Sequence, residues 1–156
     1  MADDRTTLLS VRPRFATALL DGTKTVEIRR RRAHIAEGSL CLLYASSPLC
    51  ALVGAIRVRQ VDTDSPDALW SRWGGEAGLA RPEFDAYLAG SRRPCAIVVD
   101  AAVRLPRAIA LNELRSRQDD FVTPQSYRFL RADEFASLTY GHSQQLDQLT
   151  AAGLAA

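Results

Sequence analysis

Hydrophobic and polar residues alternate most clearly between residues 24 and 30. Val26 and Ile28 are separated by polar residues, and this two-residue period is typical of a half-buried strand. One face of the predicted strand is apolar. The other face carries the Glu27 carboxylate beside the Arg29 guanidinium, so the strand presents opposite charges in a row.

Shorter patterns of the same kind predict the other elements. Strands are predicted at residues 8–11, 24–30, 40–44, 50–61 and 95–99, and residues 102–105 either extend the last strand or pair with it. Helices are predicted at residues 13–21, 66–73, 82–88 and 132–140, with a helical turn at 111–114. Gly54 interrupts the longest strand and indicates a bulge or bend, which a small barrel needs at its corners.

This order of elements predicts an α+β fold with one domain. Residues 1–142 contain all the predicted strands and show no repeat or linker. Few apolar side chains anchor the alanine-rich segment 143–156, so we expect it to be a mobile tail.

Lys24 is the only lysine of the chain, and every other basic residue is arginine or one of two histidines. A lysine supplies a compact, titratable ammonium where arginine supplies a planar fork that stays charged. We expect Glu27 to remain ionised beside Lys24 and Arg29 and to hold both cations in place. The alternative is a solvated polar face with ordinary cross-strand pairs.

Two other segments place arginine beside polar or aromatic residues. The run 29–32 consists of arginine alone, which favours contact with phosphates or, alternatively, forms a solvated loop. Tyr127 and Phe129 alternate with Ser126 and Arg128, which predicts a hydroxyl and a guanidinium on the same face.

Charge is distributed unevenly although the net charge is only +2. Residues 1–60 contain ten basic and five acidic residues, giving +5, whereas residues 61–100 contain four and seven, giving −3. A basic first segment followed by an acidic one favours a surface that faces a polyanion.

Composition excludes several classes of protein. No apolar run approaches the ~18 residues of a membrane span, and the first residues lack the core of a signal peptide, so a cytoplasmic location is predicted. Cys41, Cys50 and Cys95 lie among apolar residues and are expected to be buried hydrophobes. The two histidines, His34 and His142, are far apart, and we expect neither a metal site nor a cofactor.

The spacing of Gly22, Lys24, Glu27 and Arg29 resembles the signature of ASCH domains, which belong to the PUA-like superfamily. The resemblance covers about residues 8–130 and includes further positions: Gly38, Tyr44, and the segments 70–73, 85–90 and 124–127. It implies a small PUA-like mixed β-barrel with flanking helices. It also implies a nucleic-acid or nucleoside site in a cleft beside the first helix and the signature strand.

RNA binding is the first functional hypothesis. The residues expected to bind nucleic acid are Arg12, Lys24, Glu27, Arg29, Arg30, Tyr44, Ser126, Tyr127 and Arg128. The arginines would contact phosphates, and Tyr44 or Tyr127 would stack on a base. Single-stranded RNA is the expected partner, since splayed bases fit a cleft.

Two alternatives remain open. The first is a metal-independent ribonuclease, or a related hydrolase, in which Lys24, Tyr44 and Ser126 are catalytic and stabilise the reacting phosphate. Similar proteins that hydrolyse N4-acetylcytidine carry threonine where this chain has Glu27, so that amidohydrolase activity is not expected. The second is a regulator that senses a nucleotide or binds DNA, although the short helices show no helix-turn-helix pattern.

Overall fold

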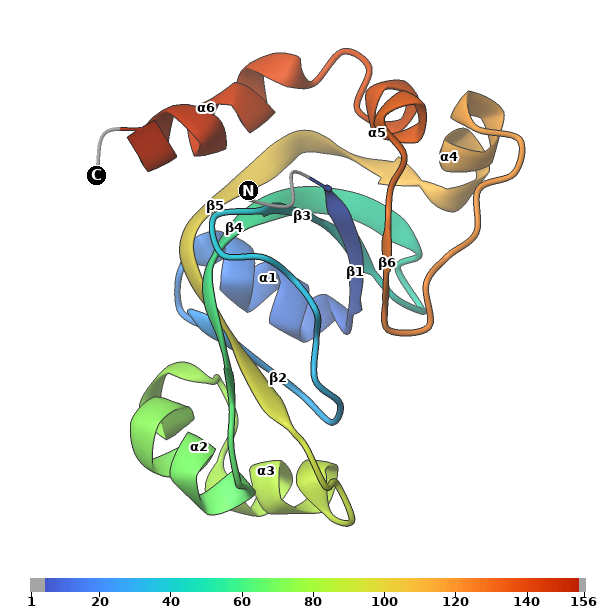
Figure 1. Ribbon diagram of the computed structural model, residues 1–156. Helices are drawn as coiled ribbons and strands as arrows, with labels where there is room; N and C mark the ends of the chain where they lie inside the picture. Colours follow the sequence, from blue (N-terminus) through green and yellow to red (C-terminus); the bar gives the residue numbers. More distant parts are fainter. Residues whose placement is uncertain (1–4, 155–156) are drawn as a thin grey trace.

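Six strands form one mixed sheet in the order β2-β5-β4-β3-β1-β6. The computed structural model describes residues 5–154, and within that range the strands are β1 (Thr7–Val11), β2 (Val26–Arg29), β3 (Leu40–Ala45), β4 (Ala51–Thr63), β5 (Cys95–Ala110) and β6 (Tyr127–Phe129). Only the neighbours β1 and β3 are parallel among these pairs. The sheet curves into a half-barrel whose edge strands are β2 and β6 (Figure 1). The predicted α+β, barrel-like fold is therefore confirmed.

Helices cover both faces and one end of the half-barrel (Figure 1). They are α1 (Pro13–Asp21), α2 (Pro66–Trp73), the 3₁₀ turn η1 (Gly74–Glu76), α3 (Arg81–Leu88), α4 (Leu111–Arg117), α5 (Ala132–Leu138) and α6 (Ser143–Leu154). Helix α1 packs inside the curve of the sheet, whereas α4, α5 and α6 pack against its outer face. Helices α2 and α3 pack where β2 and β5 extend beyond α1.

Helix α1 begins and ends where the sequence predicts. Pro13 occupies the first helical position, whose amide needs no partner. Ala16 and Leu19 are buried against the sheet. Gly22 ends the helix with a φ of 83°, a left-handed conformation that glycine adopts without steric cost. The chain then turns directly into β2, which places Lys24 between the helix and the strand.

Strands β4 and β5 are long and bend together. Their register shifts between Leu52 and Gly54, as the predicted bulge requires. A Cβ atom on Gly54 would lie 2.6 Å from Leu20 Cδ2 of α1 and still closer to the Val103 carbonyl oxygen. Glycine therefore allows the sheet to approach α1 at the bend. Residues 102–105 extend β5 and do not form a separate pairing strand.

Residues 143–154 of the predicted tail lie within the described residues, and residues 155–156 lie outside them. The described part forms helix α6, and Leu146 and Leu149, three residues apart on one helical face, are buried against the sheet. The Arg57 guanidinium also donates a hydrogen bond to the Leu149 carbonyl oxygen at 3.0 Å. Two buried leucines and one guanidinium thus anchor the helix. No described helix is long and apolar enough to cross a membrane.

Candidate functional site

A cleft of about 470 Å³ lies between the start of α1, strand β2 and helix α3. It has the size of a small-molecule or nucleotide pocket. Polar and charged side chains from α1, β2 and α3 line it together with Phe15 and Tyr87. The lining residues are Ser10, Val11, Arg12, Phe15, Lys24, Glu27, Ile28, Arg29, Ser46, Leu79, Glu83, Ala86, Tyr87 and Gln125.

Lys24 is the most unusual residue of the cleft because its side chain is only 1% exposed. Its ammonium lies 3.3 Å from Glu27 Oε2 and donates a hydrogen bond to the Ala77 carbonyl oxygen. It also lies 4.7 Å from the centre of the Phe15 ring, within cation–π range. Burial lowers the pKa of Lys24, and the Glu27 carboxylate opposes this shift. The ammonium is thus held charged by one carboxylate in a largely apolar surrounding.

Glu27 lies between the two cations of the signature strand. Arg29 Nη1 is 3.6 Å from its Oε1 atom, and Lys24 is next to its Oε2 atom. The Glu27 side chain is only 6% exposed. Apart from its ion pair with Lys24, Oε2 has no hydrogen-bond partner among the described residues. This buried oxygen can therefore accept a hydrogen bond from a ligand in the cleft.

Arg29 connects the two open edges of the half-barrel. It belongs to edge strand β2, and its Nη1 atom donates to the Ser10 carbonyl oxygen of β1 at 3.0 Å. Its Nη2 atom donates to Ser126 Oγ at 2.7 Å, immediately before the opposite edge strand β6. These contacts hold the guanidinium at the cleft wall in a fixed orientation.

The structure brings most of the signature residues together. Arg12, Lys24, Glu27 and Arg29 all line the cleft. Ser126 joins them through its hydrogen bond with Arg29. Of these residues, the strand period by itself predicts only that Glu27 and Arg29 share a face.

Arg30 has a different role from the one expected. Its guanidinium donates to the carbonyl oxygens of Tyr87 and Ala89 at 2.6 and 3.1 Å. It therefore satisfies carbonyl groups at the end of α3. Both atoms of its fork are used inside the protein, so Arg30 positions α3 and with it the cleft wall.

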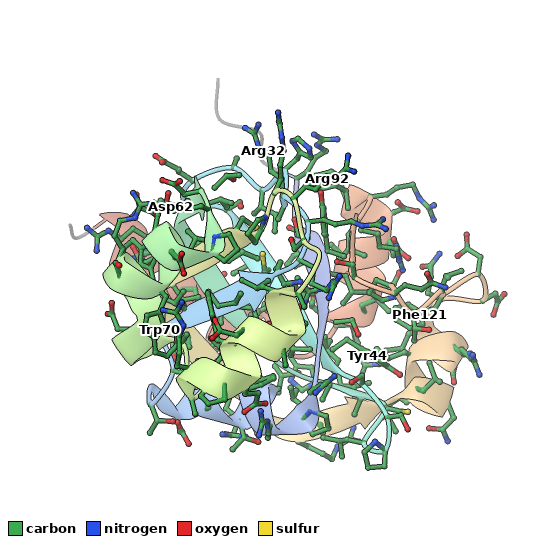
Figure 2. All side chains as sticks on the ribbon, turned by 90° about the horizontal axis from the view of Figure 1, so that it is seen from below. Arg32, Tyr44, Asp62, Trp70, Arg92 and Phe121 are labelled. Carbon is green, nitrogen blue, oxygen red and sulfur yellow. The ribbon has the colours of Figure 1, made fainter. Side chains whose placement is uncertain are left out.

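Two predicted tyrosines lie outside the cleft lining. Tyr44 is 3% exposed and packs beside Phe121, with ring centres 6.4 Å apart (Figure 2). Burial, with a contribution from the neighbouring Cys50 thiol, raises the pKa of Tyr44 to about 12. The Tyr127 hydroxyl accepts a hydrogen bond from the His34 amide at 3.0 Å. The Tyr44 ring is therefore not open for stacking, and the half-buried Tyr127 has its hydroxyl fixed by His34.

Arg128 does not share a face with Ser126, contrary to the expectation. Its two terminal nitrogens donate to the two carboxylate oxygens of Glu134 in α5, at 2.8 and 2.9 Å. Ser126 precedes β6, so strand alternation does not extend to it. Glu134 is buried, and this bidentate pair fastens α5 to the edge strand.

Sequence reasoning did not place two aromatic residues in the site. Phe15 belongs to α1 and Tyr87 to α3. Both are only half-buried and line the cleft. Burial raises the pKa of the Tyr87 hydroxyl. Within residues 5–154, no group of three His, Cys, Asp or Glu side chains is placed to hold a metal ion.

Comparison with known proteins assigns the family. The model of the ASCH domain matches residues 9–107. The chain belongs to the ASCH domain family. It is 31% identical over 142 residues to an ASCH domain-containing ribonuclease from Zymomonas mobilis, and the match covers 91% of this chain and 95% of that protein.

Solved structures agree with the family and the fold. The crystal structure of ASCH from Zymomonas mobilis has a TM-score of 0.82 and 31% identity, over 88% of this chain and 95% of that one. The N-terminal domain of McrB from Staphylothermus marinus has a TM-score of 0.53 and 11% identity, over 87% of this chain and 93% of that one. The second likeness concerns the fold alone.

Proposed function

We propose that this ASCH protein binds single-stranded RNA in the cleft beside α1 and cleaves it there. The single observation that carries the proposal is the buried Lys24–Glu27–Arg29 group, which opens into a cleft of nucleotide size. The Zymomonas relative named as a ribonuclease, which matches along nearly the whole chain, supports RNA as the substrate. The proposal has two steps, RNA binding and RNA cleavage, and cleavage requires binding.

In this proposal, one RNA phosphate lies against Arg29 and Arg12. Arg29 already has a fixed orientation through its contacts with Ser10 and Ser126. A guanidinium held in this way stabilises negative charge as it develops, without reorganising during the reaction. Arg12 is exposed at the start of α1 and adds a second positive charge at the rim.

The RNA 2′-hydroxyl is the attacking group in this scheme. A new bond forms between the 2′-oxygen and phosphorus, and the bond from phosphorus to the 5′-oxygen breaks, which leaves a cyclic phosphate. Solvent takes the proton from the 2′-hydroxyl, and the Lys24 ammonium gives a proton to the departing 5′-oxygen. A lysine with a lowered pKa gives up its proton more readily than an exposed one. Glu27 is a positioning residue that keeps Lys24 charged before the reaction.

Tyr44 defines a second candidate for the reacting group. Its place in the core beside Phe121 favours a packing role, and its raised pKa makes it a poor base at neutral pH. Comparison of Lys24→Met with Tyr44→Phe decides between the two positions. Each substitution keeps approximately the size of the side chain and removes its polar group.

The test is cleavage of single-stranded RNA in the presence of EDTA, with RNA affinity measured separately. We expect the parent and Tyr44→Phe to turn over RNA and Lys24→Met to lose at least about 100-fold in turnover. Loss of turnover in Tyr44→Phe, with Lys24→Met still active, would move the reaction to Tyr44. A parent that binds RNA without cleaving it would reduce the proposal to RNA binding.

Measurement of the affinity for a mononucleotide beside that for a longer RNA distinguishes a nucleotide-sensing regulator from the proposed function. Such a protein would bind a mononucleotide in the cleft as tightly as a longer RNA. Our proposal requires the longer RNA to bind more tightly, because further phosphates release further counterions.

A further inference from the structure

Four exposed arginines from distant parts of the sequence lie along one margin of the molecule. Arg31 and Arg32 follow strand β2, and Arg92 and Arg93 precede strand β5. We call these four residues the arginine edge. Figure 2 shows Arg32 and Arg92 at the same margin.

Pairing of β2 with β5 brings the two arginine pairs together. The ladder between these antiparallel strands ends where Arg29 faces Cys95, so the two segments leave the sheet at the same point. Ser91 Oγ donates a hydrogen bond to the Arg30 carbonyl oxygen. The Cys95 thiol makes a 3.4 Å contact with the Arg31 carbonyl oxygen. These contacts hold the segments side by side beyond the ladder.

The side chains of the arginine edge differ from their neighbours in the same run. Arg29 and Arg30 direct their guanidinium groups to the protein. Among the described residues, none forms an ion pair or a hydrogen bond with the guanidinium groups of the arginine edge. Positive charges repel one another when they lie within a Debye length of about 10 Å. A polyanion bound along the arginine edge would offset such repulsion.

We propose that the arginine edge binds backbone phosphates of single-stranded RNA at the side of the cleft where the RNA leaves the cleft. This inference rests on the proposed function and extends the RNA path beyond the cleft. Arg31 is two residues from Arg29, a span of at most about 7 Å. An RNA with one phosphate at Arg29 thus has its next phosphates at the arginine edge. A linear chain of phosphates matches a narrow edge that continues from a cleft wall.

Contacts with phosphates carry no base sequence information. The arginine edge should therefore increase affinity for any RNA long enough to reach it and leave short substrates unaffected. It supplies binding and register, while the cleft supplies the reacting groups.

The test uses two RNA probes and two matched double variants. The probes are a single-stranded RNA of about 12 nucleotides, within the usual range of single-strand sites, and a trinucleotide that fills only the cleft. The test variant is Arg32→Gln with Arg92→Gln. The control is Arg104→Gln with Arg115→Gln, two exposed arginines on β5 and α4. Each double variant lowers the net charge by two, from +2 to 0, so nonspecific effects of charge are equal.

We expect the test variant to bind the longer RNA at least about tenfold more weakly than the control. The slope of log affinity against log salt should become shallower by about 1.4, since each lost phosphate contact on a single strand contributes about 0.7. The trinucleotide should be bound and cleaved equally by both variants. Both should melt within about 2 °C of the parent, because exposed substitutions change stability little.

Equal affinity and equal salt slope for the two variants would overturn the inference while leaving the proposed function standing. If the parent does not cleave RNA but the test variant still binds the longer RNA more weakly than the control, the catalytic proposal is wrong and the inference is supported. Vesicles of phosphatidylserine provide the remaining comparison. If the test variant binds these vesicles more weakly than the control does, and both variants bind the longer RNA equally, the surface is a membrane contact and the inference is wrong.

Discussion

Arg29 Nη2 on edge strand β2 lies 2.7 Å from Ser126 Oγ, immediately before the opposite edge strand β6. This hydrogen bond spans the opening of the half-barrel. It joins the signature strand to a segment 97 residues away in the sequence. The orientation of the guanidinium in the cleft therefore depends on the closure of the two edges.

Replacement of Ser126 by alanine should weaken RNA binding without unfolding the protein. Arg29 keeps its hydrogen bond with Ser10 but loses one of the two contacts that fix its fork. We expect the KM for RNA to rise about three- to tenfold, which corresponds to the loss of one hydrogen bond of ordinary strength. Steady-state kinetics measures this, with Ser71→Ala on the exposed face of α2 as the control. An unchanged KM would mean that Ser126 has no part in positioning Arg29.

Replacement of Glu27 by glutamine should destabilise the fold. The substitution keeps the shape but leaves the buried Lys24 ammonium without its carboxylate. Breaking a buried pair typically costs about 3–5 kcal/mol. Urea unfolding at neutral pH measures the loss. The control is Asp85→Asn, whose pair with Arg81 is exposed and should contribute little to stability. Equal stability of the two variants would show that Glu27 behaves as a surface residue.

The lowered pKa of Lys24 predicts how stability depends on pH. Between this lowered pKa and 10.5, the unfolded chain still holds a proton that folded Lys24 has lost. The contribution of Lys24 to stability therefore rises with pH in that window and is lost as the pH falls through the lowered pKa. Lys24→Met should remove this rise. The free energy of unfolding is measured against pH for the parent and for Lys24→Met, and the difference between the two curves gives the contribution of Lys24. Parallel curves would contradict the prediction.

The sequence predicts the core of the site because its charged residues are neighbours in one short segment, residues 24–29. Glu27 and Arg29 are two residues apart on a strand, so they share a face. Lys24 lies at the start of the same segment, close enough to pair with Glu27. Local periodicity therefore groups Glu27 with Arg29, whereas Lys24 joins them from the turn that precedes β2.

The remaining parts of the site depend on contacts between distant segments. Tyr44 is the last residue of a run that is apolar throughout, residues 40–44, and such a run has no alternation that identifies its outward face. Arg92 approaches Arg32 only because β2 pairs with β5. Helix α6 was missed for a similar reason, since Leu149 is anchored partly by Arg57 of β4.

The bend of the sheet gives a test of the fold that is independent of function. Gly54→Ala would place a methyl group 2.6 Å from Leu20 Cδ2 and against the Val103 carbonyl oxygen. Such overpacking typically costs about 1–3 kcal/mol. Gly75→Ala is the matched control, because its added Cβ atom would meet nothing within 4 Å. Thermal unfolding should show a large decrease only for Gly54→Ala, and equal melting temperatures would mean that the sheet relaxes at the bend.

Lys24→Arg separates binding from chemistry. The substitution keeps a positive charge in the cleft, so RNA affinity should stay within about threefold of the parent. Arginine does not give up its proton near neutral pH, so a reaction that needs the Lys24 proton should slow by at least about 100-fold. The Lys24 side chain also packs against Gly78, whose added Cβ would lie 3.3 Å from Lys24 Cδ, so the bulkier fork has little space. A melting curve therefore accompanies each assay, and only folded protein is compared. If the folded variant binds and cleaves RNA like the parent, Lys24 supplies charge alone and another group must protonate the departing oxygen.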